Sequence, residues 1–263
     1  MTDIYIEGFS FALGALAPGR LEAYFEPRRL RRMEGLSKSA LWCACEALTQ
    51  AGLEASCPKE MGLSLAVGAG SLESTCKFMD SIIDDGDELS SPTAFAGSVH
   101  NSAALSLSLF LGLRGPCVTA GQFDASFAAA LLNAQLWLQQ GFCSRMLVVA
   151  AEDVNPVAAD VLPQYPKTFA PLVRGLSAAV PFERAAAAFV LCAEPSARAR
   201  AVLKRLEFAR TGEESAPVAA DFISAAQNAV AFARGLKKQQ SVVFSDVFAG
   251  VRTQFVTEAY HAQ

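Results

Sequence analysis

The chain has 263 residues, of which 52% are hydrophobic and 18% are charged, and its formal net charge at pH 7 is −4. This composition excludes a disordered chain and predicts a folded protein with a large apolar core. The small negative charge gives no electrostatic reason to bind nucleic acid or an anionic membrane, so neither is expected as a partner.

Seven cysteines are scattered along the chain without a Cys-x-x-Cys pair. This spacing gives no support for a metal site and is typical of reduced, cytoplasmic proteins. The first residues lack the basic and apolar regions of a signal peptide, and no uninterrupted apolar run reaches membrane-spanning length. We therefore expect a cytoplasmic protein with no membrane partner, no metal and no cofactor.

Alternation and apolar periodicity predict a strand, a helix, a buried strand and two further helices in the first 113 residues. The first of these helices has Ser37 as its expected N-cap, and the last is interrupted early by His100 and Asn101. A lone histidine of this kind is expected to be structural. The arginines around Arg28–Arg32 predict a solvated face, with a docking surface for an acidic carrier protein as the alternative. The expected elements are residues 4–14, 37–51, 61–70, 71–84 and 95–113.

The stretch from Gly115 to Asp153 predicts a strand, a tight turn, a helix and a second strand. A Gly-Pro pair leads into the short run Cys117–Ala120, and Asp124 stands where a helix N-cap belongs. The helix that follows is apolar nearly all round, so it should lie inside the protein. The continuous apolar run 146–151 predicts a strand covered on both faces, and the whole unit predicts a largely parallel sheet with Cys117 facing the packing.

After Asp153 the chain is rich in proline, which predicts a long irregular segment. A buried strand, an exposed-edge strand, an amphipathic helix and two final strands are expected beyond it. In the helix, Ile223, Ala226, Val230 and Ala233 should face inward. The expected ranges are 185–194, 198–208, 221–235, 241–248 and 254–258.

The order of Pro92, Asn101, Gly115-Pro116, a buried helix, Gly141 and Glu152 resembles the N-terminal half of a β-ketoacyl synthase. The resemblance covers about residues 1–210 and implies an α/β fold of the thiolase-like type, N-terminal half only, with a layered mixed sheet and a buried central helix. It implies a single domain over 1–263, in which residues 212–263 form a short helix-plus-strands remnant in place of the second half.

In that family a reactive cysteine follows the Gly-Pro proline by eight positions, and here this position holds Asp124. A carboxylate cannot hold a durable thioester, so the resemblance implies no catalytic residue and no activity of the chain alone. It implies a chain length factor of the aryl polyene type, which pairs with a full-length β-ketoacyl synthase as a heterodimer and meets an acyl carrier protein indirectly. A homodimer of the isolated chain is the alternative assembly.

The same resemblance implies that the strand after Gly-Pro pairs with the partner's strand across the dimer axis. Gln122, close to the expected nucleophile position, resembles the glutamine that replaces the cysteine in chain length factors of polyketide synthases. An independent acyltransferase or thioesterase that uses Asp124 or His100, and a scaffold that only stabilises a partner, are the competing functions. The tunnel or interface candidates are Phe95, His100, Asn101, Cys117, Val118, Thr119, Ala120, Gln122 and Phe123.

Overall fold

The chain is described by a computed structural model with eight ranges of placed residues. These ranges are 3–53, 60–122, 125–153, 184–194, 196–210, 225–238, 242–248 and 251–259. The proline-rich segment after Asp153 lies outside them, so its expected irregular course stays a prediction.

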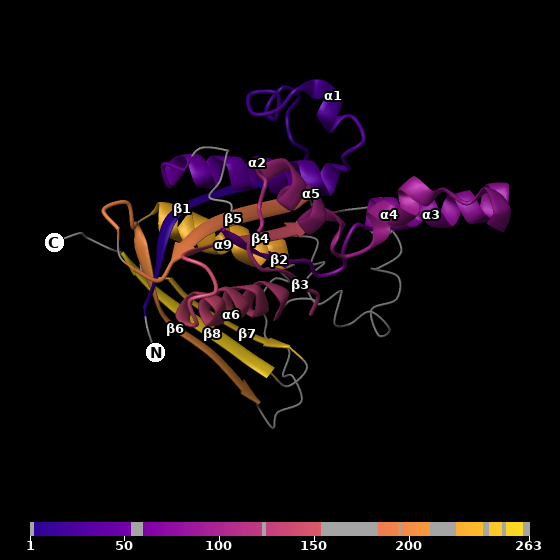
Figure 1. Cartoon of the computed structure of the whole chain (residues 1–263). Coiled ribbons are helices and arrows are strands. Elements are labelled where there is room, and N and C mark those ends of the chain that lie inside the picture. The colour runs from indigo at the N-terminus through magenta and orange to yellow at the C-terminus, as the bar shows by residue number, and fades with distance from the viewer. Residues whose placement is uncertain are drawn as a thin grey trace.

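One eight-stranded mixed sheet forms the centre of the described structure (Figure 1). Strand β2 runs parallel to both β3 and β4, and every other neighbouring pair is antiparallel. The prediction of a largely parallel sheet is therefore wrong, whereas the mixed sheet implied by the resemblance is confirmed. In sheet order the strands are β3 (Cys117–Ala120), β2 (Gly62–Ala66), β4 (Arg145–Glu152), β5 (Ala185–Cys192), β1 (Ile4–Leu13), β6 (Ala201–Arg210), β8 (Val251–Ala259) and β7 (Val242–Phe248).

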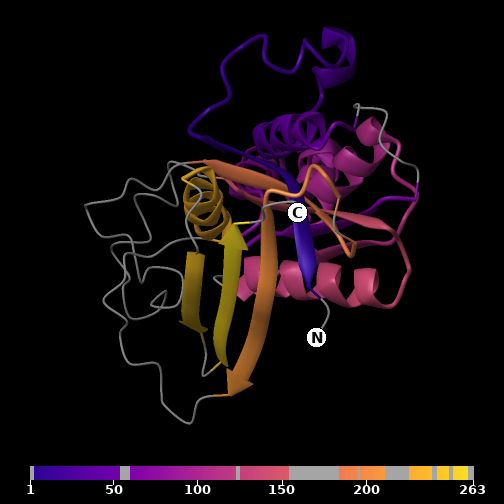
Figure 2. The same ribbon diagram turned by 90° about the vertical axis from the view of Figure 1, so that its left-hand side faces the viewer.

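Helices cover both faces of the sheet, as Figure 2 shows. One buried cluster joins the sheet to α2 (Gly35–Gln50) and α5 (Ser102–Leu111), and a second joins its other face to α6 (Ser126–Gln139) and α9 (Ala225–Lys237). Strands β2, β4 and β5 are apolar along almost their whole length because both of their faces are covered in this way. The short helix α1 (Pro27–Leu30) lies on the outer side of α2, and its Leu30 is buried in the cluster that contains α2 and α5.

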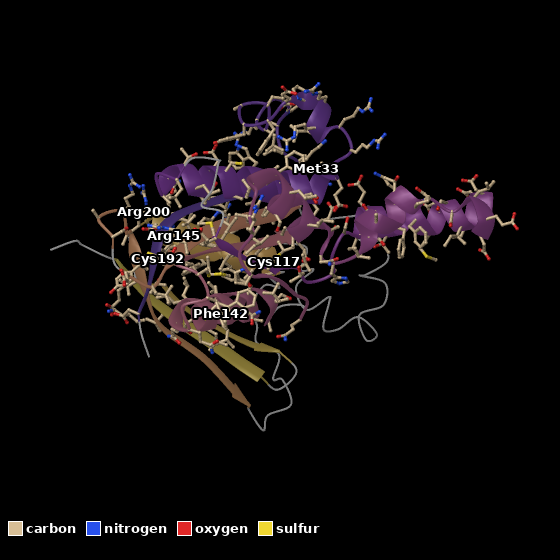
Figure 3. The ribbon with its side chains drawn as sticks, in the orientation of Figure 1. Met33, Cys117, Phe142, Arg145, Cys192 and Arg200 are labelled. Carbon is tan, nitrogen blue, oxygen red and sulfur yellow. The ribbon has the colours of Figure 1, made fainter. Side chains whose placement is uncertain are left out.

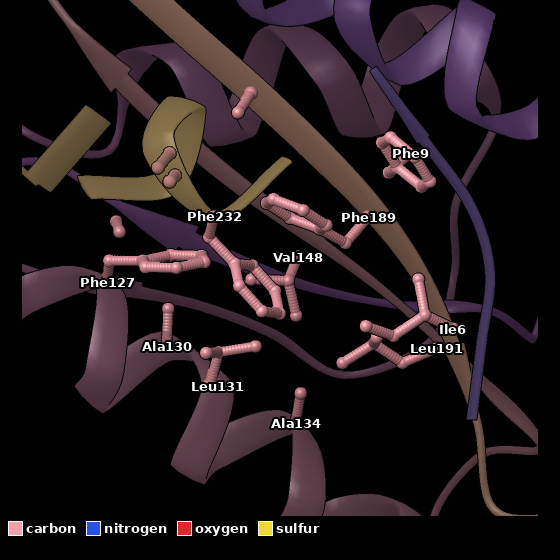
Figure 4. Packing of buried hydrophobic residues seen from close by; sticks show 14 of the residues in the cluster. Ile6, Phe9, Phe127, Ala130, Leu131, Ala134, Val148, Phe189, Leu191 and Phe232 are labelled. Carbon is pink, nitrogen blue, oxygen red and sulfur yellow. The ribbon is translucent and has the colours of Figure 1, made fainter. Parts of the chain in front are cut away.

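Three phenylalanines bring the two ends of the chain into one core (Figure 4). Phe127 of α6, Phe189 of β5 and Phe232 of α9 are buried, with ring centroids 5.3 to 5.9 Å apart. Helix α9 belongs to the segment expected as a remnant, and it packs into the main core. The inward positions Ala226, Val230 and Ala233 are confirmed as buried, and Ile223 lies outside the described residues.

Strand β6 differs from its prediction, because it lies between β1 and β8 and is not an edge strand. Its first residues, Ala201–Leu203, are buried and pair with Ile4–Ile6 of β1 on one side, and β8 pairs with it on the other. The two edges of the described sheet are β3 and β7.

The apolar run 95–113 is also not one helix. It forms α4 (Pro92–Ser98) and α5, bent by 91° where Val99 has an extended backbone. Among the described residues no single helix is long and apolar enough to cross a membrane, and only this bent pair meets that test by length and composition. Helix α2 likewise starts earlier than expected. Its N-cap is Glu34, and Ser37 lies inside the helix and donates to the Glu34 carboxylate at 3.1 Å.

Candidate functional site

The carboxyl ends of β2, β3 and β4 meet at one edge of the sheet, where α/β proteins commonly place their sites. Backbone and hydroxyl hydrogen bonds connect them. The N–H of Val67 donates to the carbonyl of Ala120 at 3.0 Å, and the hydroxyl of Ser126 donates to the carbonyl of Val67 at 2.9 Å. The N–H of Gln122 in turn donates to the Ser126 hydroxyl oxygen at 2.7 Å. The first turn of α6 is therefore held against the end of β2.

Glu152, at the end of β4, is a buried carboxylate beneath this edge. Its oxygens accept the backbone N–H groups of Gly68, at 2.7 and 3.0 Å, and of Ala69, at 3.0 Å. Burial raises the pKa of Glu152 to about 7, although these N–H donors act in the opposite direction. A side chain at Gly68 would place its Cβ 2.9 Å from a Glu152 oxygen, so the close approach requires glycine.

His100 lies above the same edge, at the break between α4 and α5. Its ring packs over two glycines, since a Cβ added at Gly70 would lie 3.3 Å from Nε2 and one added at Gly121 would lie 3.5 Å from Cδ2. The imidazole is exposed, and the expectation that His100 has a structural role stays a prediction. Its neighbour Asn101 occupies the N-cap position of α5 without a side-chain cap hydrogen bond, and Phe95 is exposed on α4.

Strand β3 forms the open edge of the sheet beside this site. Cys117 is exposed at its start, Val118 and Thr119 are half-buried, and Ala120 is buried. The prediction that Cys117 faces the packing is wrong, because β3 is paired only with β2 in the described sheet and its first residue lies on the rim between α5 and α6 (Figure 3). The Ser108 hydroxyl of α5 donates to its sulfur at 3.7 Å.

The structure describes only some of the residues near the expected nucleophile position. Phe123 and Asp124 lie outside the described residues, and Gln122 is exposed. The N-cap position of α6 is held by Ala125, not by Asp124 as expected, because the chain enters the helix through a turn in which the Ala125 N–H donates to the Gln122 carbonyl. Cys143, after α6, is buried, and burial raises the pKa of its thiol, which does not suit a nucleophile.

The described residues contain no group of three histidine, cysteine or carboxylate side chains able to hold a metal ion. Two features of this region were missed by sequence reasoning. Glu152 was named only among the residues of the family resemblance, and its contacts carried no local signal, because its N–H donors come from a turn 83 and 84 residues away. Sequence reasoning treated Leu105 and Leu109 only as part of an apolar helix. Their side chains are exposed, and their spacing of four residues places them on one face.

Comparison with known proteins fits this geometry. Residues 23–242 match the model of the β-ketoacyl synthase N-terminal domain family, which is more than half of the chain. No curated protein matches the sequence. Similar solved structures include the ishigamide ketosynthase/chain length factor, with a TM-score of 0.75, 15% identity, and coverage of 99% of this chain and 100% of the other.

Two further structures share the fold. One is a complex of a type II polyketide synthase acyl-carrier protein with its ketosynthase, AntDE:AntF, with a TM-score of 0.78, 12% identity, and coverage of 99% and 100%. The other is the ketosynthase ApeO with its chain length factor ApeC from Xenorhabdus doucetiae, with a TM-score of 0.59, 16% identity, and coverage of 95% and 99%. Identities this low show the fold alone. On the family match, this chain belongs to the β-ketoacyl synthase N-terminal domain family and has its thiolase-like fold.

Proposed function

We propose that this chain is a non-catalytic, chain length factor-like subunit that pairs with an active β-ketoacyl synthase and shapes its acyl tunnel in fatty acid or polyketide biosynthesis of the aryl polyene type. The observation that carries the proposal is the open edge at β3. An unpaired strand edge presents backbone donors and acceptors that another strand can satisfy. The exposed side chains of Leu105 and Leu109 flank it on α5 and offer apolar area for the same contact.

The chemistry at the start of α6 supports a subunit without its own condensing activity. A synthase needs a thiolate to hold the acyl group, and a helix N-terminus stabilises that thiolate. In this sequence the matching position is Asp124. Of the cysteines in the described ranges, Cys117 lies at the opposite end of β3, and none is placed at the first turn of α6.

A heterodimer also agrees with the known assemblies. The ApeO–ApeC structure is a ketosynthase in complex with its chain length factor, and this chain shares its fold. The partner we propose is a full-length synthase with an intact nucleophile, with the acyl carrier protein delivering substrate to that partner. Gln122 and Phe123 follow β3 and precede α6 in the sequence, and we propose that they are the residues that reach toward the partner's tunnel.

Reconstitution tests the proposal. A full-length synthase from the same genome is combined with malonyl-loaded carrier protein, with and without this chain, and the products are measured by mass spectrometry. We expect a stable complex, no acylation of this chain alone, and a changed product length on Phe123→Ala. Condensation or thioester formation by the isolated chain would contradict the proposal and favour an independent acyltransferase or thioesterase.

A further inference from the structure

A helical hairpin projects from the body of the fold and carries apolar side chains that nothing in the described structure covers. It consists of α3 (Leu72–Asp85), the short turn η1 (Asp87–Leu89) and α4. Figure 1 shows it extending beyond the sheet, away from β6, β7 and β8. In α3 only Ser74 is buried, although the helix is long enough to cover part of a core.

Hydrogen bonds fix the base of the hairpin to the rest of the protein. The Glu34 carboxylate accepts hydroxyl hydrogen bonds at 2.7 Å from Ser71 and Ser74 at the start of α3 and from Ser102 at the start of α5. Arg184, before β5, donates to Glu73 at 2.9 Å. These contacts fix the root of the hairpin against α2, α5 and β5.

The two arms are also joined further out. The rings of Phe78 and Phe95 are 5.2 Å apart, and the N–H of Ser91 donates to the Ser81 hydroxyl oxygen at 2.9 Å. Because these contacts connect the two arms within the chain itself, covering the hairpin surface should cost little further conformational entropy.

The surface of the hairpin combines an apolar face on α3 with exposed acidic side chains. Cys76, Met79 and Ile83 are spaced by three and four residues and share one face of α3. Ile83 is 73% exposed and Met79 is 48% exposed. Five exposed acids lie beside this face and at the hairpin tip, and Lys77, the one lysine of α3, is paired with Glu73 at 2.6 Å. The acids are Asp80, Asp84, Asp85, Asp87 and Glu88.

We propose that this acidic hairpin is a second contact with the partner synthase, and that it inserts its apolar ridge into a partner groove rimmed by lysine or arginine. The inference rests on the proposed function. Two observations favour the partner synthase as the protein that covers the hairpin: the exposed apolar side chains that follow it in the chain, and its negative charge. Along the chain, exposed apolar side chains recur from α3 through Phe95 and Val99 to Leu105 and Leu109 of α5, the helix whose Ser108 donates to Cys117 at the β3 edge. The surplus of carboxylates repels an anionic lipid surface and another acidic hairpin, so it favours a basic partner surface.

The test compares variants in binding to the same full-length synthase, with the dissociation constant measured by isothermal titration calorimetry. We expect Met79→Ser/Ile83→Ser to raise the Kd about tenfold or more, because both side chains lose their apolar contact. Asp80→Asn/Asp84→Asn should raise the Kd less and reduce its dependence on salt. Phe142→Ser is the matched control, since Phe142 is 62% exposed beyond α6 and should leave the Kd unchanged.

The outcomes separate the two proposals. Wild-type chain that fails to bind any full-length synthase overturns the proposed function itself. Wild-type binding with an unchanged Kd for both hairpin variants, each with a wild-type melting temperature, overturns the hairpin contact alone. The wild-type chain could also self-associate, with the Met79→Ser/Ile83→Ser variant remaining monomeric. This result would assign the ridge to a second copy of the chain and would overturn the hairpin contact with the synthase. Flotation of the wild type, but not of the Met79→Ser/Ile83→Ser variant, with phosphatidylcholine–phosphatidylglycerol vesicles would also overturn the hairpin contact and would assign the ridge to a membrane surface.

Discussion

The carboxylate of Glu152 accepts the backbone N–H of Gly68 at 2.7 Å, and this contact joins the end of β4 to the turn after β2. Burial raises the pKa of Glu152 to about 7, from an ordinary value of 4.5. Between these values the folded chain holds a proton that the unfolded chain has released. The stability that this group contributes is therefore complete below about pH 4.5 and decreases as the pH rises to about 7.

Glu152→Gln removes this titration. Between pH 5 and pH 8 the wild type should therefore lose about 2 kcal/mol of unfolding free energy relative to the variant. One pKa unit corresponds to about 1.4 kcal/mol. Urea unfolding at several pH values measures the difference. Parallel curves for the two proteins would show that Glu152 does not change protonation in this range.

Glu7 and Arg145 form a second buried contact, between β1 and β4. Burial alone would raise the pKa of Glu7, but hydrogen bonds from Arg145, at 2.7 and 3.3 Å, and from Ser196 hold that pKa below its ordinary value. Arg145→Met should lower the free energy of unfolding by about 2–3 kcal/mol, because it leaves a buried carboxylate without its cation.

Two comparisons test that explanation. Glu7→Gln/Arg145→Met should recover most of the lost stability, since the unpaired charge is then absent. Lys204→Met breaks an exposed pair with Asp3 and should change the stability by less than about 1 kcal/mol. A double variant as unstable as Arg145→Met alone would mean that packing of the arginine, and not its charge, is lost.

Local pattern predicted most elements because each depends on nearby residues. The apolar runs of β4 and β5 are buried as expected, and the Gly-Pro signal leads into β3. The errors concern long-range pairing. Whether β6 is an edge strand is decided by β1 and β8, which lie far away in the chain. The site at the sheet edge is assembled in the same way. Spacing to a family motif marked Asp124 and Gln122, and the family resemblance included Glu152, but no local pattern predicted the contact of Glu152 with the turn after β2.

The C-terminal helix offers a direct test of how the core is built. Phe232 of α9 contacts the rings of Phe127 and Phe189 and is 1% exposed. Phe232→Ala should lower the free energy of unfolding by about 3–5 kcal/mol, as for other buried phenylalanines. The exposed Leu136→Ala should cost less than about 1 kcal/mol under the same conditions. Equal small losses would show that α9 does not stabilise the main core.

Cys117 reports directly on the β3 edge. It is the exposed cysteine of the described ranges, whereas Cys43, Cys45, Cys143 and Cys192 are buried, and burial also raises the pKa of the half-buried Cys76. A thiol reagent should therefore label Cys117 first in the isolated chain, and the fast phase should disappear in Cys117→Ser. Pairing of β3 with a synthase strand covers this edge, so the complex should slow the fast phase about tenfold or more, in proportion to the bound fraction. Labelling at an unchanged rate in a saturated complex would place the partner on another surface, and the contact through β3 would have to be abandoned.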